Sequence, residues 1–271
     1  MSIGQNIKNL RKANNLTQDQ LAEELDISFQ AVSSWERDEY KPETDKLIRL
    51  AEILDVSVSS IVEEKQDSFK TKKAIYNWEH MKTFVKVSAK ANKLSNTLKA
   101  VDFALKAHEG QKRKRSSIPY IYHPLNLACH ALSMNIVEDE IVAACLLHDV
   151  VEDCDIKADA LPVNDEVKEL VLLLTKEDYT DENRDKVLSA YYKKIGKNPK
   201  AALIKCLDRC NNLTTMSWGL SREKIFRMIK ETEKFYPGLL DVVKATPEYN
   251  NAAFLLKYHM ESMLDIYKRL L

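Results

Sequence analysis

Apolar residues recur at intervals of three and four along nearly the whole chain, beginning with Ile3, Ile7 and Leu10. This interval matches the turn of an α-helix, so it predicts helices with one buried face. Glycine, which is common in turns, occurs only 5 times in 271 residues. The sequence therefore predicts an all-α fold.

A polar stretch divides this pattern into two predicted modules. The segment QDSFKTKK, residues 66–73, has no helical apolar stripe and follows a sequence typical of the end of a compact unit. We expect a first module at residues 1–65, a linker at 66–75 and a second module at 76–271.

Charge is balanced over the whole chain but not within each module. Residues 1–65 hold 8 lysines and arginines against 13 acids, a net charge of −5, and the remainder carries +5. No apolar run approaches the roughly 20 residues that span a bilayer, and the N-terminus has no apolar signal core. The protein is therefore expected in the cytoplasm with no membrane partner. Its five cysteines form no CxxC pair and are expected to be reduced.

The first module carries clear signals for helix starts. The hydroxyl of Thr17 can accept a hydrogen bond from a free amide in the first turn of a helix that begins QDQLAEEL. A break at residues 26–28 leads to a second helix at 28–36, in which Val32 and Trp35 are expected to face inward. A further helix, roughly residues 43–54, closes the predicted core.

The segment LTQDQLAEELDISFQAVSSWERDEYKPETDKLIRLAEILDVSVSSI resembles the Cro/C1-type helix-turn-helix domain, over about residues 3–62. The resemblance implies that the helix at 17–25 crosses the DNA backbone and that the helix at 28–36 enters the major groove. It implies base or phosphate contacts from Gln18, Gln30, Ser33 and Ser34.

Two features of this module disfavour DNA binding. Asp38 follows the WER triplet where the family usually has glycine, which places an acid near the expected DNA-facing side. The module is also net acidic, whereas neutralisation of phosphates by cations supplies most non-specific affinity for DNA. A helix-turn-helix used for dimerisation or protein contact is the alternative. A homodimer would suit the paired half-sites that such domains usually bind.

In the second module the apolar run AACLL, residues 143–147, leads directly into HDVVED, residues 148–153. His148 and Glu152 are four residues apart, as are Asp149 and Asp153, so on a continuous helix each pair shares a face. A solvent-exposed helix edge would explain acids at this place. A metal site would also explain why they follow a buried run so closely.

Two other segments can supply partners for a metal site. His123 stands directly before Pro124, a residue typical of a helix start. Asp208 follows the apolar run LIKCL, with Asn212 one helical turn later. The two imidazoles and two carboxylates suit a first-row divalent ion, and such an ion lowers the pKa of water that it binds. The candidate ligands are His123, His148, Asp149 and Asp208.

The order H…HD…D is that of the HD-domain metal-dependent phosphohydrolases. Five segments in succession resemble the hydrolase domain of the RelA/SpoT-type alarmone enzymes, including the small stand-alone alarmone hydrolases, over about residues 95–245. These segments are HEGQKRKRSSIPYIYHPLNLACHAL, AACLLHDVVED, LLLTKED, ALIKCLDRCNNLTT and IKETEKFYPGLL.

This resemblance implies a larger α-helical HD domain that holds Mn²⁺ at the four ligands and cleaves the 3′-pyrophosphate of (p)ppGpp. Glu152 would transfer a proton, and Asp153 would orient water or share that role. Substrate contacts would come from Arg113, Lys114, Asn212 and Thr215. The cationic run KRKR, residues 112–115, and the net charge of +5 favour a polyanionic nucleotide.

Departures from the family pattern keep alternatives open. The usual glycine before PYI is replaced within residues 116–118, and Thr214 stands where the family has arginine. The substrate could therefore be another phosphorylated nucleotide, such as NADPH or a dNTP. A transcriptional regulator that senses a nucleotide without turnover is the third interpretation, although such a sensor has no need of Glu152 and Asp153.

The remaining polar residues have simpler interpretations. Lys176, Glu177 and Asp178 are expected in a surface turn. The other histidines have no ligand spacing and are expected to be structural: His80, His108, His130 and His259.

Overall fold

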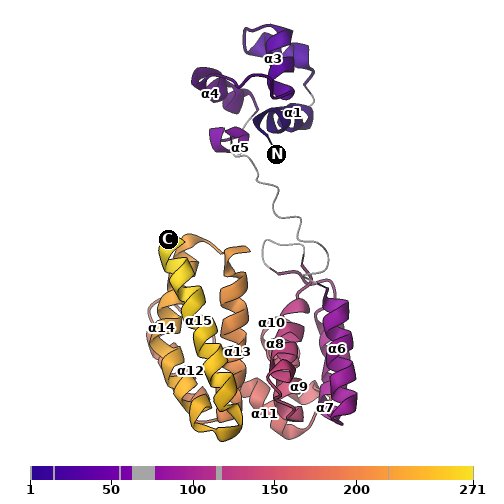
Figure 1. The fold of residues 1–271 in the computed structure, drawn as a ribbon, viewed down its shortest axis with the longest axis vertical. Coiled ribbons are helices and arrows are strands. Elements are labelled where there is room, and N and C mark those ends of the chain that lie inside the picture. Colours follow the sequence, from indigo (N-terminus) through magenta and orange to yellow (C-terminus); the bar gives the residue numbers. More distant parts are fainter. Residues whose placement is uncertain are drawn as a thin grey trace. The chain divides into compact units, whose positions relative to one another are not determined.

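The computed structural model describes residues 2–14, 16–54, 56–62, 77–113, 118–218 and 220–270 (Figure 1). Helices dominate these ranges, and within them no strand forms beyond one isolated antiparallel bridge between Lys112 and Pro119. The expected all-α fold is confirmed. The chain separates into two compact units, Met1–Ile75 and Tyr76–Leu271, each with its own apolar core. Over the described part of the chain, no helix has the length and apolar character needed to cross a bilayer.

Short helices connected by capped turns form the first unit. They are α1 (Ile3–Ala13), α2 (Gln18–Glu24), α3 (Phe29–Glu36), α4 (Thr44–Ile53) and α5 (Val58–Val62). The predicted cap at Thr17 is confirmed: its hydroxyl accepts from the backbone N–H of Gln20 at 3.1 Å, and the Gln20 side chain accepts from the backbone N–H of Thr17 at 2.8 Å. Asp26 takes a positive φ of 53° between α2 and α3, which allows the chain to reverse there.

A buried ion pair connects the helices of this unit. Arg11 of α1 donates to both carboxylate oxygens of Glu36 on α3, at 2.6 and 3.1 Å, and to the carbonyl of Leu16 at 2.6 Å. Gln18 of α2 also donates to Glu36, at 2.6 Å. Burial raises the pKa of Glu36, but the hydrogen bonds from Arg11 and Gln18 outweigh it and lower the pKa below its usual value. The pair therefore fixes α1, α2 and α3 against one another.

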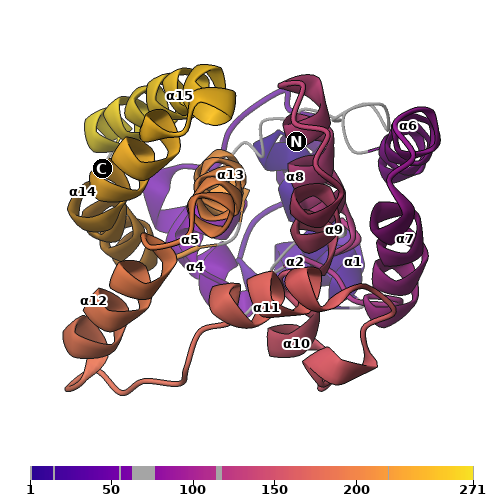
Figure 2. The same cartoon turned by 90° about the horizontal axis from the view of Figure 1, so that it is seen from below.

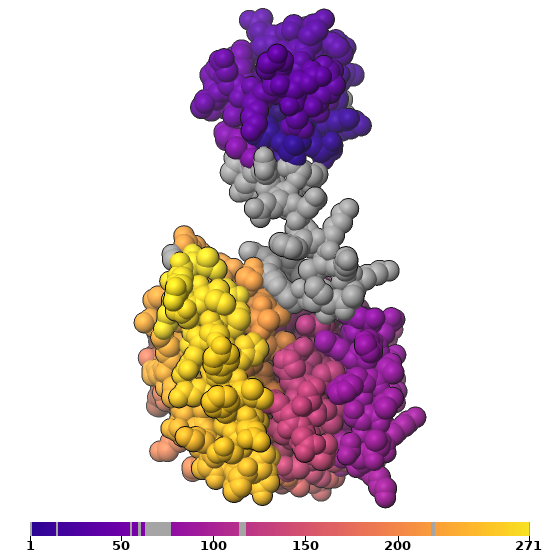
Figure 3. Space-filling model, in the orientation of Figure 1, coloured from indigo at the N-terminus to yellow at the C-terminus, as the bar shows by residue number. Residues whose placement is uncertain are grey.

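Longer helices build the second unit. They are α6 (Trp78–Ala91), α7 (Ser95–Ala107), α8 (Tyr122–Ser133), α9 (Asp139–Leu147), α10 (Val150–Asp153), α11 (Asp165–Leu174), α12 (Arg184–Ile195), α13 (Pro199–Thr215), α14 (Arg222–Ala245) and α15 (Asn250–Leu270). Helix α13 lies in the middle, with α8 and α9 on one side and α14 and α15 on the other (Figure 2). In Figure 3, α15 covers much of one face of this unit.

The central position of α13 follows from its sequence. Every residue from Ala201 to Asn211 is buried, including Lys205, Asp208 and Arg209. A helix that is buried on all sides has to satisfy its polar groups internally. Arg209 therefore pairs with Glu231 of α14, and Lys205 pairs with Asp208 of α13 itself. Asp208 also approaches His123 of α8, at the candidate site.

The continuous helix assumed for the pairs His148/Glu152 and Asp149/Asp153 is interrupted. Helix α9 ends at Leu147 and α10 begins at Val150, with ψ of −8° at Asp149, far from the value of about −42° in an α-helix. The expectation of one continuous helix was wrong because the backbone turns at the residues that carry the candidate ligands. The backbone of Asp153 still donates to the carbonyl of Asp149 at 2.8 Å.

Candidate active site

The four predicted ligands converge from three separate segments. His123 lies in the first turn of α8, His148 and Asp149 at the junction of α9 and α10, and Asp208 on α13. His123 Nε2 is 3.2 Å from Asp208 Oδ1 and 3.4 Å from Asp149 Oδ2. His148 Nε2 is 3.1 Å from Asp149 Oδ1 and 3.9 Å from Asp208 Oδ1. The ligand atoms of His123, His148 and Asp149 all lie within 4.8 Å of one another.

Both imidazoles are oriented by hydrogen bonds on their far side. Nδ1 of His148 lies 2.9 Å from the carbonyl of Cys145, and Nδ1 of His123 lies 2.6 Å from the side-chain oxygen of Asn211. Asn211 in turn donates to Asn126 at 2.7 Å, so its oxygen has to face His123. An oxygen partner requires the proton on Nδ1, so in each ring the other nitrogen, Nε2, faces the centre of the cluster and can bind a cation when it carries no proton.

The carboxylates of Asp149 and Asp208 also accept hydrogen bonds from side chains around the cluster. Asp208 accepts from Lys205 Nζ at 2.7 Å and from the Asn212 amide at 2.6 Å. Asp149 accepts from the hydroxyl of Tyr120 at 2.7 Å. These contacts fix where the oxygen atoms face, which is a requirement for a site that binds a cation tightly.

The electrostatics of the cluster favour a positive charge at its centre. Burial lowers the pKa of His148, but Asp149 and Asp208 outweigh that effect and raise it to about 9. Burial raises the pKa of Asp208, and the ammonium of Lys205 lowers it well below its usual range. His148 Nε2 is buried and makes no hydrogen bond with any described residue. An orphaned imidazole nitrogen among carboxylate oxygens fits a divalent metal ion, so the described donor set can hold one.

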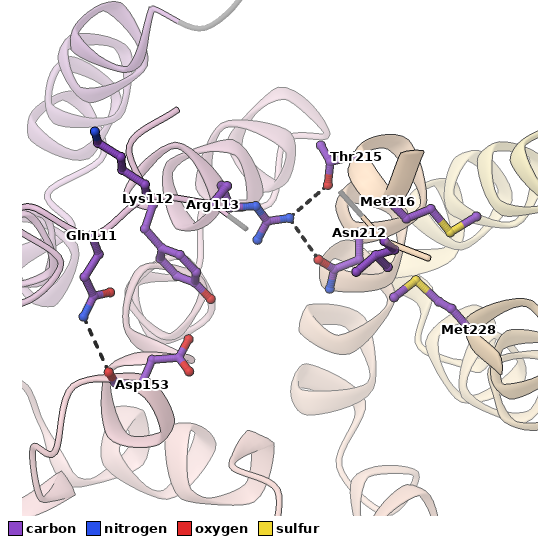
Figure 4. Close-up of a pocket in the computed structure, with 10 residues that line it drawn as sticks. Gln111, Lys112, Arg113, Asp153, Asn212, Thr215, Met216 and Met228 are labelled. Atoms are coloured by element: carbon purple, nitrogen blue, oxygen red, sulfur yellow. Dashed lines mark hydrogen bonds between the residues drawn. The ribbon is translucent and has the colours of Figure 1, made fainter. Parts of the chain in front are cut away.

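A cavity of about 470 Å³ lies beside the cluster (Figure 4). Its wall consists of Gln111, Lys112, Arg113, Tyr120, Asp153, Asn212, Thr215, Met216, Leu220 and Met228. In Figure 4, Arg113 extends toward α13, where it donates to Thr215 Oγ1 at 2.9 Å and Asn212 Oδ1 at 3.3 Å. Three predicted substrate contacts therefore meet at one wall, and the fourth, Lys114, lies outside the described residues.

The two predicted catalytic acids have different surroundings. Asp153 is exposed and lines the cavity. Glu152 is also exposed, but its carboxylate accepts from the backbone N–H of Lys176 at 3.3 Å and is not part of the cavity wall. The helix is interrupted at Asp149, between His148 and Glu152, so the helical stacking expected for these two residues does not apply.

Several residues at the site were missed by sequence reasoning. Tyr120 and Lys205 contact the candidate ligands Asp149 and Asp208 directly, and Asn211 orients His123. Tyr120 stands only three residues before His123, which was an available signal; no spacing pointed to Asn211. His108 was expected to be structural, and it packs on Tyr120 with ring centres 4.8 Å apart.

Glu177 and Asp178 are exposed, as expected, but they lie in a segment without regular structure or a turn, and the expectation of a surface position was wrong for Lys176. The Lys176 side chain is half-buried, with Nζ 5.7 Å from the ring centre of Tyr191. Burial, together with the positive charge of Lys205, lowers the pKa of Lys176. Apolar contacts of its long stem allow a lysine to enter the protein in this way.

Thr214, which replaces the family's arginine, does not line the cavity. Its hydroxyl donates to the carbonyl of Cys210 at 2.8 Å and lies 3.2 Å from Nε2 of His259 on α15. This departure from the family pattern therefore lies outside the cavity wall. Of the altered segment 116–118, only Ile118 is among the described residues.

Three of the predicted DNA-contacting residues, Gln30, Ser33 and Ser34, lie on α3, and the fourth, Gln18, begins α2. Gln30 is exposed, whereas Ser33 accepts a hydrogen bond from Arg37 and Ser34 is half-buried. The half-buried Gln18 has its amide N–H engaged by Glu36. Among the four, Gln30 is thus the most accessible to a nucleic acid.

Asp38 has a structural role in the first unit. Its φ of 58° is left-handed, a conformation that explains why glycine is usual at this place. Its carboxylate accepts from the backbone N–H of Gly4 at 2.9 Å and from the hydroxyl of Ser2. The acid therefore caps the N-terminus of α1, where a negative charge is favourable.

Comparison with known families finds one family model in each of the two units. The family model for the HD domain matches residues 100–239, just over half of the chain. The chain belongs to the HD-domain family. All four candidate ligands of this HD domain lie within the matched range, and a helix-turn-helix model matches residues 7–61 of the first unit.

Curated relatives of this HD domain are longer than the matched part of the chain, and several are named as (p)ppGpp hydrolases. A guanosine-3′,5′-bis(diphosphate) 3′-pyrophosphohydrolase of Aquifex aeolicus is 33% identical over 174 residues, 60% of this chain and 24% of that protein. One of Vibrio cholerae is 36% identical over 144 residues, 49% of this chain and 19% of that protein. The bifunctional (p)ppGpp synthase/hydrolase SpoT of Escherichia coli K12 is 31% identical over 176 residues, 61% of this chain and 24% of that protein. The matched part therefore spans about a quarter or less of these relatives.

A solved structure shares the fold of the HD domain. It is described as a metazoan ortholog of SpoT that hydrolyzes ppGpp. The match has a TM-score of 0.50 and 21% sequence identity, and it covers 63% of this chain and 94% of the other. At this identity the likeness concerns the fold.

Proposed function

We propose that the HD domain is a metal-dependent (p)ppGpp 3′-pyrophosphohydrolase. The observation that carries this proposal is the position of Arg113, Asn212 and Thr215 on the wall of a cavity beside the His/Asp cluster. A phosphate-binding guanidinium next to a cation site suits a substrate with a diphosphate group. The names of the curated relatives support the choice of nucleotide.

The proposed reaction is hydrolysis at the phosphorus attached to the ribose O3′. Water adds to this phosphorus, the bond to O3′ breaks, and a proton moves from the water to O3′, which gives GDP or GTP and pyrophosphate. His123, His148, Asp149 and Asp208 would hold a divalent ion, which would lower the pKa of the reacting water, and Mn²⁺ suits this nitrogen and oxygen donor set.

Residues of the chain itself perform the remaining steps. Arg113 binds the phosphate oxygens, on which negative charge accumulates during the reaction. Asp153, on the cavity wall, is placed to carry the proton. Glu152, whose carboxylate accepts from the backbone N–H of Lys176, shares the transfer of this proton. Lys114, from the cationic run, adds a second phosphate contact.

Purified protein with Mn²⁺ should be incubated separately with ppGpp, NADPH and a mixture of dNTPs. We expect turnover of ppGpp, its loss in Asp149→Ala, and no loss in Asp159→Ala, an exposed acid away from the site. Turnover of NADPH alone would assign a different substrate. Binding of nucleotide without turnover of any would favour a sensor.

We also propose that the first unit binds DNA through α3, as a homodimer. The support is the helix-turn-helix match and the exposed Gln30. Gel-shift selection from random duplexes should recover a site with two half-sites, and Gln30→Ala should weaken it. Failure to select any sequence, at low salt, would favour a protein-contact role for the module.

A further inference from the structure

Tyr120 contacts both parts of the candidate site. Its hydroxyl donates to Asp149 Oδ2 at 2.7 Å, and its ring centre lies 5.6 Å from the guanidinium carbon of Arg113. The same side chain lines the cavity beside the cluster. Tyr120 belongs to the turn directly before α8, and His123 lies in the first turn of that helix.

The hydroxyl constrains the rotation of the Asp149 carboxylate. Oδ1 of Asp149 lies 3.1 Å from Nε2 of His148, and Oδ2 lies 3.4 Å from Nε2 of His123. A carboxylate side chain can rotate unless a donor fixes one oxygen. The phenol supplies that donor, so each oxygen stays beside one imidazole.

The ring has support of its own and gives support to Arg113. His108, which is only 3% exposed and lies 2.8 Å from Gln111, packs against the ring with centres 4.8 Å apart. An aromatic ring attracts a nearby guanidinium through its electron-rich face. Together with the bonds to Asn212 and Thr215, this attraction keeps Arg113 extended across the cavity.

We propose that Tyr120 is a positioning residue with two separable effects: its hydroxyl sets the metal ligand Asp149, and its ring sets the phosphate-binding Arg113. This inference rests on the proposed function of the site. It assigns separate roles to the hydroxyl and to the ring of Tyr120, and the role of the hydroxyl can be measured as Mn²⁺ affinity, apart from catalysis.

The test compares Tyr120→Phe, which removes the hydroxyl, with Tyr120→Leu, which removes both groups. Tyr258→Phe is the matched control, because Tyr258 is 68% exposed on α15. Mn²⁺ affinity is measured from the free-ion signal in electron paramagnetic resonance, and KM for ppGpp is measured at saturating Mn²⁺. Thermal melting of each full-length variant reports on folding.

Tyr120→Phe should bind Mn²⁺ about 10- to 100-fold more weakly, as is typical when an outer partner of a ligand is removed, with KM for ppGpp unchanged. Tyr120→Leu should show the same loss and a KM raised roughly 3- to 10-fold, because the guanidinium loses its aromatic support. Tyr258→Phe should match the unchanged protein in both measurements.

Unchanged Mn²⁺ affinity in Tyr120→Phe would overturn the role of the hydroxyl, and equal KM values in the two variants would overturn the role of the ring. A Tyr120→Phe variant that loses Mn²⁺ affinity and also melts at a clearly lower temperature than the unchanged protein would also count against positioning, because general unfolding would then explain the loss. If the unchanged protein binds no Mn²⁺, the proposed function fails and the inference fails with it. If it binds Mn²⁺ and hydrolyses ppGpp while Tyr120→Phe behaves identically, only the inference fails.

Discussion

The imidazoles of His123 and His148 and the carboxylates of Asp149 and Asp208 form one cluster. Their charges determine how metal binding at this site responds to pH. Without a metal ion, Asp149 and Asp208 retain a proton on His148, whose pKa is about 9 despite burial. A cation that binds to Nε2 has to displace that proton. The same carboxylates that favour the proton therefore favour the ion that replaces it.

Mn²⁺ affinity should rise as the pH is raised toward 9, because the raised pKa keeps His148 protonated at lower pH. The expected slope is up to roughly tenfold per pH unit. Free Mn²⁺ measured by electron paramagnetic resonance at several pH values checks this prediction. Equal affinity at about pH 6 and about pH 8 would show that no such proton is displaced.

Asn211 should affect metal binding without touching the ion. Asn211→Leu removes the oxygen that faces His123 Nδ1, so Mn²⁺ affinity should fall by about 10- to 100-fold. Asn250→Leu, an exposed position at the start of α15, is the control. Undiminished affinity in Asn211→Leu would mean that His123 is oriented by packing alone.

At the scale of elements, periodic positions were predictable and contacts across the fold were not. Spacing of three and four identified the helices, and Thr17 and the break at 26–28 followed from local chemistry. The spacing of residues 148–153 did not predict the interruption at Asp149, where the candidate ligands of α8 and α13 meet. The same holds for Tyr120 with Asp149 and for Asn211 with His123, whose partners lie far apart in sequence.

The buried pair of Arg11 and Glu36 should dominate the stability of the first unit. Glu36→Ala leaves the Arg11 guanidinium buried without its partner, which should destabilise the unit by about 3 kcal/mol. Glu39→Ala, which removes an exposed pair with Arg37, should leave the melting temperature unchanged. Urea titration followed by circular dichroism compares the stability of the two variants. Equal unfolding midpoints for Glu36→Ala and Glu39→Ala would contradict the structural role of the Arg11–Glu36 pair.

At the scale of the whole molecule, two units with separate cores combine a helix-turn-helix with an HD domain. Separate cores should unfold separately. Calorimetry of the full chain should therefore show two transitions, and Glu36→Ala should lower only one of them. A single transition lowered as a whole by Glu36→Ala would contradict independent units.

The central claim is hydrolysis at the phosphorus on O3′, and isotope transfer from water tests it most directly. The full-length protein is incubated with ppGpp and Mn²⁺ in water enriched in ¹⁸O, and the products are resolved by mass spectrometry. The account predicts GDP and pyrophosphate in equal amounts, with ¹⁸O only in the pyrophosphate, and neither product from Asp149→Ala. Label in GDP, or ppGpp that remains intact while Mn²⁺ is bound, would contradict it.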